Sequence, residues 1–580
     1  MNKESFLAII NRKWKIPYSE TVSKTVSSFS LTEKIIFYFL ILIFILSSFT
    51  MLWRVNESFL IKIPTYGGQF TEGIVGSPRF VNPILAVSDI DRDLTALMYS
   101  GLLKINEDGL LVPDLAQSYE ISDDGKIYTF ILKDEIYFHD GKPVTVDDII
   151  FTIEKTKDPI IKSPRRISWE GVEVLKIDDK TIQFILRQPY SPFIQNTTLG
   201  ILPKHIWEGA SSEEFPFSQF NINPIGTGPY KVDSIVYSSG GLPKEYKLVS
   251  FKKYISGRPY INKINIKTFT NEIDLIEAYN RKDIISLYGI SPETLSEIKV
   301  PEGSLKITPL SRVFGIFFNQ NSAPALLRSE VREALALATN KTEIINSVLS
   351  GYGKEVEGPI PPKEINGVNY QFNEENIEKA KSLLSSGGWK EDENGILERV
   401  SGGDTTKLVF SISTSASPDL KLAAQIIQNQ WQKIGVLVDI KIFEPTDLTQ
   451  NIIKPRKYDA ILFGTVIGRD MDLYPFWHSS QRNDPGLNIS MYTNSKVDRI
   501  LENIRVTNDQ EEKNNLYTEF TQEIVRENPA IFIYTPYFIY LTANNIQNIN
   551  LNQLTTPSER FNTIDKWYIE TNSVWKIFAK

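Results

Sequence analysis

The sequence predicts a mixed α/β protein that is preceded by one transmembrane helix. A long run near the N-terminus is apolar and uncharged, which is typical of a membrane span. In the remainder of the chain, strand-like segments alternate with helix-like segments and no repeat is sustained. The 580 residues are 41% hydrophobic and 23% charged, which is ordinary for globular proteins and sufficient for large cores.

The apolar run Ile35–Trp53 is the predicted transmembrane helix. At about 1.5 Å per residue it nearly crosses a hydrocarbon core of about 30 Å. The preceding tail, 1–34, carries more Lys and Arg than Asp and Glu, so we expect it in the cytoplasm and everything after Arg54 outside. A cleaved signal peptide is the rival interpretation, but the tail is long for one and Ser48–Thr50 is a poor cleavage site.

Short segments rich in β-branched and aromatic residues, bounded by turn formers, predict strands after a linker at Asn56–Gly68. The predicted strands are Tyr128–Leu132, Thr181–Leu186, Lys407–Ser413, Leu437–Phe443, Ala460–Thr465 and Ala530–Thr535. Their alternation with helices places the protein in the α/β class, although it does not show where the chain passes between lobes.

The predicted helices have clear start and stop signals. The capping box Thr145–Asp148 opens a helix that runs through Glu154. Ser417–Pro418 supplies an N-cap and a proline at the first helical position, and Gly435 ends the helix that follows. Two more helices are predicted, one from Asn373 to Gly387–Gly388 and one that ends near Asn528–Pro529.

The composition argues against several classes of protein. The net charge is −7 and no long basic run occurs, so no nucleic-acid partner is expected. The absence of Cys excludes disulfides, zinc–thiolate sites and thiol nucleophiles. The histidines do not share the helical spacing of metal ligands, so neither a metal site nor a cofactor is expected. They are His139, His205 and His478.

Three motifs resemble chemical sites but do not meet their requirements. Asp89–Asp93 begins like a calcium loop, yet Leu94 replaces the turn glycine and Ser100 the bidentate Glu, so these acids are expected to start a helix. Gly226–Tyr230 lacks the Lys and Ser/Thr of a phosphate-binding loop, and His139–Gly141 is typical of a turn. No catalytic residues are predicted, and binding without chemistry is the expected function.

A series of long, spaced motifs runs through the chain from about Gly67 to Tyr540. The block Phe138–Thr152 (FHDGKPVTVDDIIFT) is the most specific of them. Others in order are Asn82–Pro83, Arg92–Asp93, Ser100–Leu103, Pro113–Ala116, Ser118–Glu120, Asp123–Gly125, Gly226–Val232, Val331–Lys341, Ile377–Trp389, Gln428–Ile440, Tyr458–Asp459 and Val497–Arg505. In this pattern the chain resembles family 5 of the bacterial extracellular solute-binding proteins, the peptide- and nickel-binding class.

The resemblance implies two lobes that face a cleft, in a periplasmic-binding-protein-like fold of type II, the class with an extra subdomain. Crossovers near Ser311–Phe317 and Ile531–Pro536 would join the lobes. The expected boundaries are 1–34 for the cytoplasmic tail, 35–53 for the transmembrane helix, 65–103 with 194–311 and 531–580 for lobe I, 104–193 for the extra subdomain, and 312–530 for lobe II.

The resemblance also implies a function. The chain would capture extracellular peptides between its lobes, close over them by hinge motion, and deliver them to an ABC permease. Because a separate ATPase subunit hydrolyses ATP, the chain itself would not be an enzyme. Gram-positive relatives are usually tethered by a lipid on a Cys, which this chain lacks, so the helix 35–53 would be the membrane tether.

The expected ligand contacts lie in the segment after the strand Ala460–Thr465. By resemblance, Asp470 matches the carboxylate that pairs with a peptide's α-amine, and Asp472 is the second choice. The rival interpretation is that both acids cap the following turn. The strand end at Val466, Ile467 and Gly468 would pair with an extended peptide through backbone hydrogen bonds.

Further contacts are expected from the loop Val87, Ser88 and Asp89 and from Arg165. Arg165 stands where some relatives have an aromatic residue, and it would either bind a ligand carboxylate or remain a solvated surface residue. Trp477 and Tyr254 are candidates for lining the pocket.

Other functions remain open at this stage. A member of the same family that binds a sugar, an opine or a metal complex is the nearest alternative. A membrane-tethered hydrolase and a signalling receptor are more remote, since no nucleophile–base pair can be named in the sequence.

Overall fold

The computed structural model describes residues 19–295, 298–362, 372–507 and 509–578. The chain divides into two units, one formed by Met1–Thr65 with Thr571–Lys580 and the other by Tyr66–Glu570. We expected all of 531–580 to belong to lobe I, but its last residues join the N-terminal unit instead. The other expected boundaries of the lobes stay a prediction.

The predicted membrane span lies within helix α3 (Leu31–Phe59), which follows α2 (Ser19–Ser27). At the start of α3 the Glu33 carboxylate accepts a hydrogen bond from the Ser30 N–H at 2.8 Å, as one half of a capping box. None of the residues of α3 is buried by the rest of the protein. Among the described residues, α3 is the one helix that is long and apolar enough to cross a membrane. The predicted apolar helix is confirmed, and its crossing of a membrane stays a prediction.

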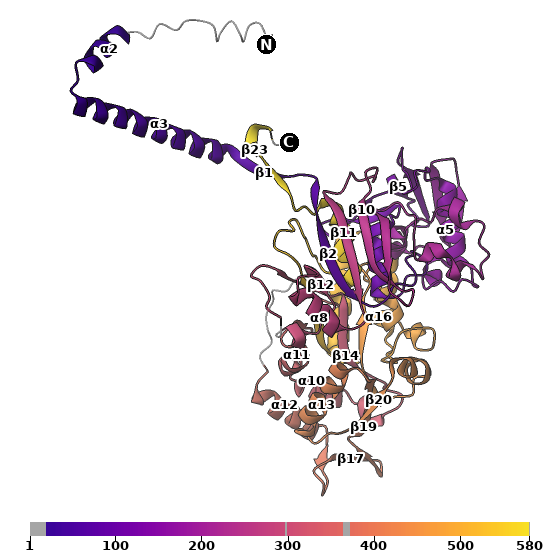
Figure 1. Ribbon diagram of the computed structural model, residues 1–580. Helices are drawn as coiled ribbons and strands as arrows, with labels where there is room; N and C mark the ends of the chain where they lie inside the picture. The colour runs from indigo at the N-terminus through magenta and orange to yellow at the C-terminus, as the bar shows by residue number, and fades with distance from the viewer. Residues whose placement is uncertain (1–18, 296–297, 363–371, 508, 579–580) are drawn as a thin grey trace. The chain divides into compact units, whose positions relative to one another are not determined.

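Helix α3 continues directly into strand β1 (Leu60–Pro64), so the prediction of a linker at Asn56–Gly68 was wrong. Strand β1 pairs antiparallel with β23 (Thr571–Trp575) in a sheet of two strands. Both strands belong to the N-terminal unit, where Figure 1 shows them side by side at the end of α3. The sequence of 56–68 does not show that this segment contains a strand, because its pairing partner β23 lies more than 500 residues further along the chain.

A sheet of 12 strands runs through the unit Tyr66–Glu570 (Figure 1). Its main order is β20-β19-β21-β14-β22-β12-β2-β11-β10-β9, and β13 and β15 also pair with β22. The strands are β2 (Gly67–Val75), β9 (Tyr230–Tyr237), β10 (Pro243–Ser250), β11 (Ile261–Phe269), β12 (Ser286–Tyr288), β13 (Leu305–Pro309), β14 (Arg312–Phe318), β15 (Gly353–Glu355), β19 (Val409–Ser415), β20 (Leu437–Phe443), β21 (Ala460–Val466) and β22 (Ala530–Leu541).

Strand β22 is shared by the two halves of this sheet. Its first part pairs with β14 and β15, and its second part, from Tyr537, pairs with β13 and β12. Strands β13 and β14 follow each other in sequence, and between them the Leu310 N–H donates to the Pro536 carbonyl oxygen at 3.0 Å. The chain therefore passes between the halves twice at neighbouring points, which is an arrangement suited to a hinge.

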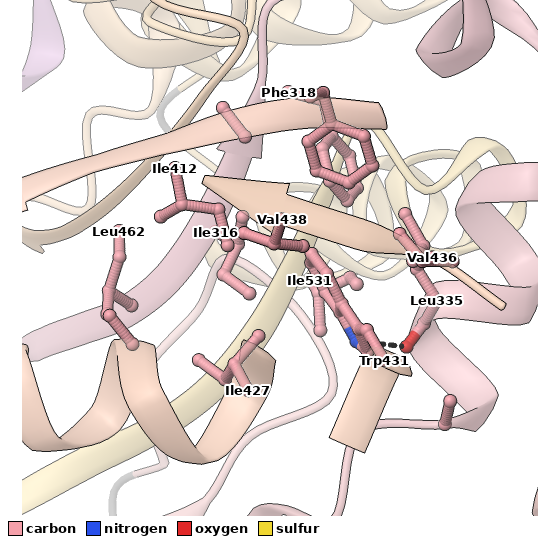
Figure 2. Packing of buried hydrophobic residues seen from close by; sticks show 14 of the residues in the cluster. Ile316, Phe318, Leu335, Ile412, Ile427, Trp431, Val436, Val438, Leu462 and Ile531 are labelled. Carbon is pink, nitrogen blue, oxygen red and sulfur yellow. Dashed lines mark hydrogen bonds between the residues drawn. The ribbon is translucent and has the colours of Figure 1, made fainter. Parts of the chain in front are cut away.

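The half of the sheet built on β14 has a hydrophobic core on each face. Ile316 and Phe318 belong to one core and Val313 and Phe317 to the other, because successive strand residues point to opposite faces. In the first core (Figure 2), Trp431 of α13 (Pro418–Gln432) is fully buried and donates its indole N–H to the Leu335 carbonyl oxygen at 3.1 Å.

The half of the sheet built on β2 contains a buried charge cluster beside its core. The guanidinium of Arg560 pairs with Glu72 at 2.5 Å and with Asp93 at 2.7 Å, and all three side chains are fully buried. The hydroxyl groups of Tyr540 and Tyr288 donate to these carboxylates at 2.7 and 2.8 Å. The hydrogen bonds satisfy charges that would otherwise be costly to bury.

A second sheet of four antiparallel strands has its own core, which it shares with helix α5 (Val146–Lys157). At the start of α5 the Asp148 carboxylate accepts from the Thr145 N–H at 2.8 Å, as the predicted capping box requires. The order is β5-β6-β8-β7, with bounds β5 (Ala116–Ile121), β6 (Ile127–Leu132), β7 (Glu173–Lys176) and β8 (Thr181–Ile185).

The remaining elements are short or lie around these sheets. The helices are α4 (Asp89–Met98), α6 (Arg166–Trp169), α7 (Lys204–Trp207), α8 (Glu272–Asn280), α9 (Pro292–Leu295), α10 (Ser329–Leu337), α11 (Lys341–Leu349), α12 (Glu374–Ser386), α14 (Pro445–Asp447), α15 (Tyr474–Trp477), α16 (Ser495–Val506) and α17 (Gln510–Glu527). The small strands are β3 (Leu103–Ile105), β4 (Leu111–Pro113), β16 (Lys390–Glu391), β17 (Leu397–Ser401) and β18 (Asp404–Lys407).

The predicted strands and helices are confirmed, with differences at their ends. Strand β22 extends to Leu541, well beyond the predicted Thr535, and β19 begins at Val409 because Lys407 belongs to the preceding hairpin. Helix α5 continues past Glu154 to Lys157. The acids at Asp89–Asp93 start α4, as predicted.

Candidate functional site

A cavity of about 450 Å³ lies within the unit Tyr66–Glu570. Its walls come from α4, β3, α6, the segment around Gln195, the segment after β21 and the segment around Phe561. The charged residues among its lining are Arg92, Lys104, Asp114, Arg165, Arg469, Asp470, Glu559 and Asp565. Its size is within the range of sites for small ligands.

Asp470 lies at the wall of this cavity without a cationic partner. In the described part of the chain, no Lys, Arg or His nitrogen forms an ion pair with its carboxylate. Burial is the main cause that raises the pKa of Asp470, to about 6, and the nearby charge of Asp472 adds to this shift. A carboxylate in this situation is poised to take a cation from a ligand.

The local backbone that carries Asp470 is fixed against β14. Ser311, the residue before β14, makes two hydrogen bonds with Ile467. The Ile467 N–H donates to the Ser311 carbonyl oxygen at 2.9 Å, and the Ser311 hydroxyl donates to the Ile467 carbonyl oxygen at 2.7 Å. A Cβ at position 468 would lie 2.4 Å from an oxygen of the Asp470 carboxylate, so another residue there would displace this side chain. The acid is therefore held in place by the sheet.

Asp472 differs from Asp470 because protein groups already neutralise it. Its carboxylate accepts from the Arg505 guanidinium at 2.6 and 2.9 Å and from the Tyr190 hydroxyl at 3.0 Å. The Arg505 guanidinium in turn lies over the Tyr474 ring, 3.8 Å from its centroid. Both acids also accept a backbone N–H two residues further on, at 3.3 Å, so turn capping and charge pairing coexist here.

The strand end that precedes Asp470 is partly open. Strand β19 pairs with β21 only at Ala460 and Ile461, so β21 has a strand partner on one side alone up to Val466. Val466 is 45% exposed, whereas Ile467 is buried in a core. Gly468 lines the cavity with Asp470, and the other two residues do not.

Trp477 does not line the cavity, which corrects the expectation for this residue. It is 3% exposed and packs in a core against Phe317 and Phe532, with ring centroids 6.2 and 5.7 Å away. Tyr254 does line the cavity, as expected. Large aromatic residues serve both cores and pockets, so the sequence alone did not separate the two roles.

The expected loop at Val87 lies beside the cavity lining rather than in it. Val87 is 58% exposed, Ser88 caps α4, and Asp89 forms an exposed ion pair of 3.8 Å with Arg92. The cavity is lined by Arg92 itself and by Arg165. The structure thus brings Gly468, Asp470 and Arg165 to one cavity, and it leaves the loop 87–89 at its margin.

Several cavity residues were not predicted from the sequence. Arg469 pairs with Glu559 at 2.7 Å, and Lys104 lies 3.8 Å from both Asp114 and Asp565. Their partners are far apart in sequence, so no local spacing would reveal them. Four buried polar atoms of the lining also have no hydrogen-bonding partner among the residues that the structure describes; they are Arg92 Nε, Thr95 Oγ1, Tyr99 OH and Thr555 Oγ1.

Among the residues that the structure describes, no cluster of His, Asp and Glu has the form of a metal site. His139 is half-buried between two glycines, with Nδ1 3.3 Å from the Gly226 nitrogen and Nε2 3.1 Å from the Gly228 carbonyl oxygen. His205 pairs with Asp140 at 2.8 Å on the surface of the same region. These contacts are structural, as expected for the turn at His139–Gly141.

Comparison with known proteins gives relatives that match over most of their own length and most of the length of this chain. The oligopeptide-binding protein AppA of Bacillus subtilis (strain 168) is 28% identical over 520 residues, which cover 87% of this chain and 92% of the relative. The dipeptide-binding protein of Escherichia coli (strain K12) is 26% identical over 489 residues, covering 79% and 87%.

Solved structures agree with this comparison. Bacillus subtilis AppA in complex with a nonapeptide has a TM-score of 0.65 at 27% identity, over 88% of this chain and 100% of that one. NikZ from Campylobacter jejuni in complex with Ni(L-His) has a TM-score of 0.66 at 26% identity, over 86% and 99%. These relatives are two-lobed binding proteins of mixed α/β structure, so the predicted fold class is confirmed.

A family model supplies the assignment. The model described as "Bacterial extracellular solute-binding proteins, family 5 Middle" matches residues 111–485, which is more than half of the chain. The match includes both the FHDGK block and Asp470. The chain therefore belongs to family 5 of the bacterial extracellular solute-binding proteins.

Proposed function

We propose that this protein is the substrate-binding component of an ABC importer, and that it captures extracellular peptides beside Asp470 and delivers them to a membrane permease. The observation that carries the proposal is the half-buried Asp470 carboxylate, which lines the cavity without an ion-pair partner among the described residues. A carboxylate that loses water on ligand binding needs a cation, and a peptide's α-ammonium group supplies one. The names of the oligopeptide- and dipeptide-binding relatives support a peptide ligand.

The remaining contacts would hold the peptide without selecting strongly among side chains. The open side of β21 near Val466 offers backbone groups to an extended peptide, in the manner of an added strand. Arg165 and Arg92 line the same cavity as Asp470 and would attract a ligand carboxylate. A peptide has a positive α-ammonium group and a negative carboxylate, which suits a cavity that is lined by both acidic and basic residues.

In this role the protein would bind its ligand and leave it chemically unchanged. ATP hydrolysis and translocation would belong to the permease and ATPase subunits of the same transporter. Membership of a family of solute-binding proteins supports this division of labour.

The tether is a further part of the proposal. Helix α3 would span the membrane once, with residues 1–34 in the cytoplasm and the binding unit Tyr66–Glu570 on the extracytoplasmic side. The length and hydropathy of α3 support this topology, as does the basic tail before it.

A metal complex of an amino acid is the second candidate ligand. The structure of NikZ with Ni(L-His) favours it, because that protein covers nearly the same length of this chain as AppA does. Sugars and opines are further alternatives within the family, and a simple sugar has no ammonium group for Asp470 to bind.

The test is calorimetry on the full chain in detergent, with one short peptide in free and N-acetylated forms. The free peptide should bind, and the acetylated form should bind at least about a hundredfold more weakly, because loss of one partner of a desolvated charge pair costs about 3–5 kcal/mol. Nickel–histidine complex and sugars serve as the other ligands. Equal affinity for both peptide forms would contradict the amine contact, and binding of the nickel complex alone would favour the second candidate.

A further inference from the structure

The apolar helix α3 is longer than its uncharged run. The run ends at Trp53, but the helix continues through Arg54 to Phe59. At about 1.5 Å per residue, this extension carries the chain roughly 9 Å beyond the run. If α3 spans a membrane as proposed above, residues from Arg54 to Phe59 lie at the level of the lipid headgroups.

A segment from the other end of the sequence is fixed against this extension. In the β1–β23 pair, Trp575 lies opposite Leu60, the first residue after α3. The Trp575 indole N–H donates to the side-chain oxygen of Asn56 at 2.8 Å, and its ring lies 6.2 Å from that of Phe59. Asn56 is three residues after Trp53, so the indole is held within about one helical turn of the apolar run.

The residues that follow Trp575 have an unusual surface for a water-soluble segment. Lys576–Phe578 form a short 3-10 turn, η8, in which Ile577 is 77% exposed and Phe578 is 72% exposed. Trp575 is itself 44% exposed and Phe59 is 54% exposed. Contiguous apolar side chains of this kind mark a surface that another phase or partner covers.

We propose that the segment Trp575–Phe578 inserts into the interface of the membrane that α3 spans, so that the protein contacts the bilayer through both ends of its sequence. This inference rests on the proposed membrane tether. Tryptophan is enriched at membrane interfaces because its ring is apolar while its N–H is polar, and here the N–H is bonded to Asn56. Lys576 would face the phosphate groups, while Ile577 and Phe578 would reach the acyl boundary.

The position of the segment favours lipid over a protein partner. Antiparallel pairing directs β23 back toward the end of α3, and η8 follows β23 directly in sequence. The apolar side chains of η8 and those of α3 belong to the same unit of the structure, Met1–Thr65 with Thr571–Lys580. If lipid covers the exposed side chains of α3, the boundary of that lipid lies close to Trp575, the residue before η8.

The absence of Cys from the chain permits a direct test. Full-length Ile577→Cys, and separately Phe578→Cys, is labelled with an environment-sensitive fluorophore and reconstituted into vesicles that contain lipids with a quencher near the headgroup. The label at either position should shift its emission to the blue and lose fluorescence when the quencher is present. Ser573→Cys is the matched control, because Ser573 is an exposed polar residue on β23 and its label should stay unquenched.

A third variant separates this inference from the tether. Ser47→Cys places the label within the apolar run of α3, where deep quenchers should reduce its fluorescence. If the label at 47 is quenched and those at 577 and 578 behave like the label at 573, the interfacial contact is refuted while the tether stands. If the label at 47 also stays in water, the tether fails and the inference falls with it.

Discussion

Asp470 and Asp472 are two residues apart but differ in how their charges are balanced. The carboxylate of Asp472 forms an ion pair with Arg505 and a hydrogen bond with Tyr190, whereas Asp470 lines the cavity. The resemblance to the family predicted that one of the two acids faces the ligand, and it ranked Asp470 first. In the described part of the chain Asp470 has no ion-pair partner whereas Asp472 has one, so Asp470 is the carboxylate that we expect to bind an ammonium group.

The substitution Asp470→Asn should weaken the binding of a free peptide by at least about a hundredfold, because it removes one partner of a buried charge pair and leaves the ammonium group uncompensated. Calorimetry of the wild type and the variant measures the difference. Asp439→Asn is the control, since Asp439 is exposed on β20 and should not affect binding. An unchanged affinity in Asp470→Asn would show that this acid does not contact the ligand.

Peptide binding should depend on pH through the same group. The pKa of Asp470 is raised to about 6 by burial, and an ammonium ligand favours the ionised form. Affinity should therefore be highest near pH 7 and fall by up to about tenfold per pH unit below pH 6, as the carboxyl is protonated before the ligand arrives. It should fall again above about pH 8, where the α-amine loses its proton.

Affinity measured from pH 4.5 to 8.5 checks this profile. The acidic limb should disappear in Asp470→Asn, because that variant has no proton to bind at this position. A profile that is flat between pH 5 and 7 in the wild type would contradict the role given to Asp470.

The expectation that Trp477 lines the cavity was not met, whereas the same expectation for Tyr254 was, and the reason is physical. Trp477 and Tyr254 are both large and both more than nine-tenths buried, but one packs in a core and the other lines the cavity. Burial favours both positions equally, so side-chain type carries no information on which of them a residue takes.

At the scale of elements, the turn that carries His139 joins two parts of the binding unit. It lies between β6 and α5, and its imidazole is bonded to the glycine-rich segment Gly226–Gly228 that precedes β9. The sequence predicted a turn there, and the turn is confirmed. It did not predict that the two motifs contact each other.

His139 should make the folded protein less stable in acid. Burial lowers its pKa to about 4, whereas the unfolded chain titrates near 6.5. The unfolded state then binds more protons between these values, so stability is complete above about pH 6.5 and is lost as the pH falls toward 4. The loss amounts to about 3 kcal/mol for a shift of this size, at about 1.36 kcal/mol per pKa unit.

The comparison that isolates this effect is the difference between wild type and His139→Asn. Other acids titrate in the same range in both proteins and cancel in the difference. Unfolding by denaturant at pH 7 and at pH 4.5 should show that acid destabilises the wild type more than the variant. An equal loss in both proteins would show that His139 is not buried in its neutral form.

Elements with local signals were predicted well, and elements that depend on distant partners were not. Helices α5 and α13 begin at caps that the sequence displays. Strands β1 and β23 have no such signal, because each is short and defined by pairing with a segment far away in the sequence. A pattern of period two or 3.6 does not report such a partner.

At the scale of the whole binding unit, topology determines which charges reach the cavity. Arg469 meets Glu559, and Lys104 meets Asp565, because the fold brings the segment after β22 beside the segment after β21 and beside β3. The sequence contains these residues but no local spacing that links them. Family resemblance predicted two lobes and a cleft, and the individual ion pairs that line it had to be seen in the structure.

The two passages between the halves of the large sheet, at Leu310–Ser311 and within β22, should act as a hinge. Peptide binding at Asp470 would then bring the halves together. We expect the distance between spin labels on Lys244→Cys and Lys441→Cys, which lie exposed on β10 and β20, to change when a free peptide is added. The chain has no native Cys to interfere.

Two controls make this experiment decisive. A label pair on Lys390→Cys and Lys441→Cys lies within 312–530, which we expect to move as one lobe, so its distance should stay constant. The N-acetylated peptide should leave the first distance unchanged, since it lacks the ammonium group that Asp470 needs. A distance between 244 and 441 that stays the same at saturating free peptide would rule out closure, because a ligand shifts a two-state equilibrium only by its difference in affinity for the two states.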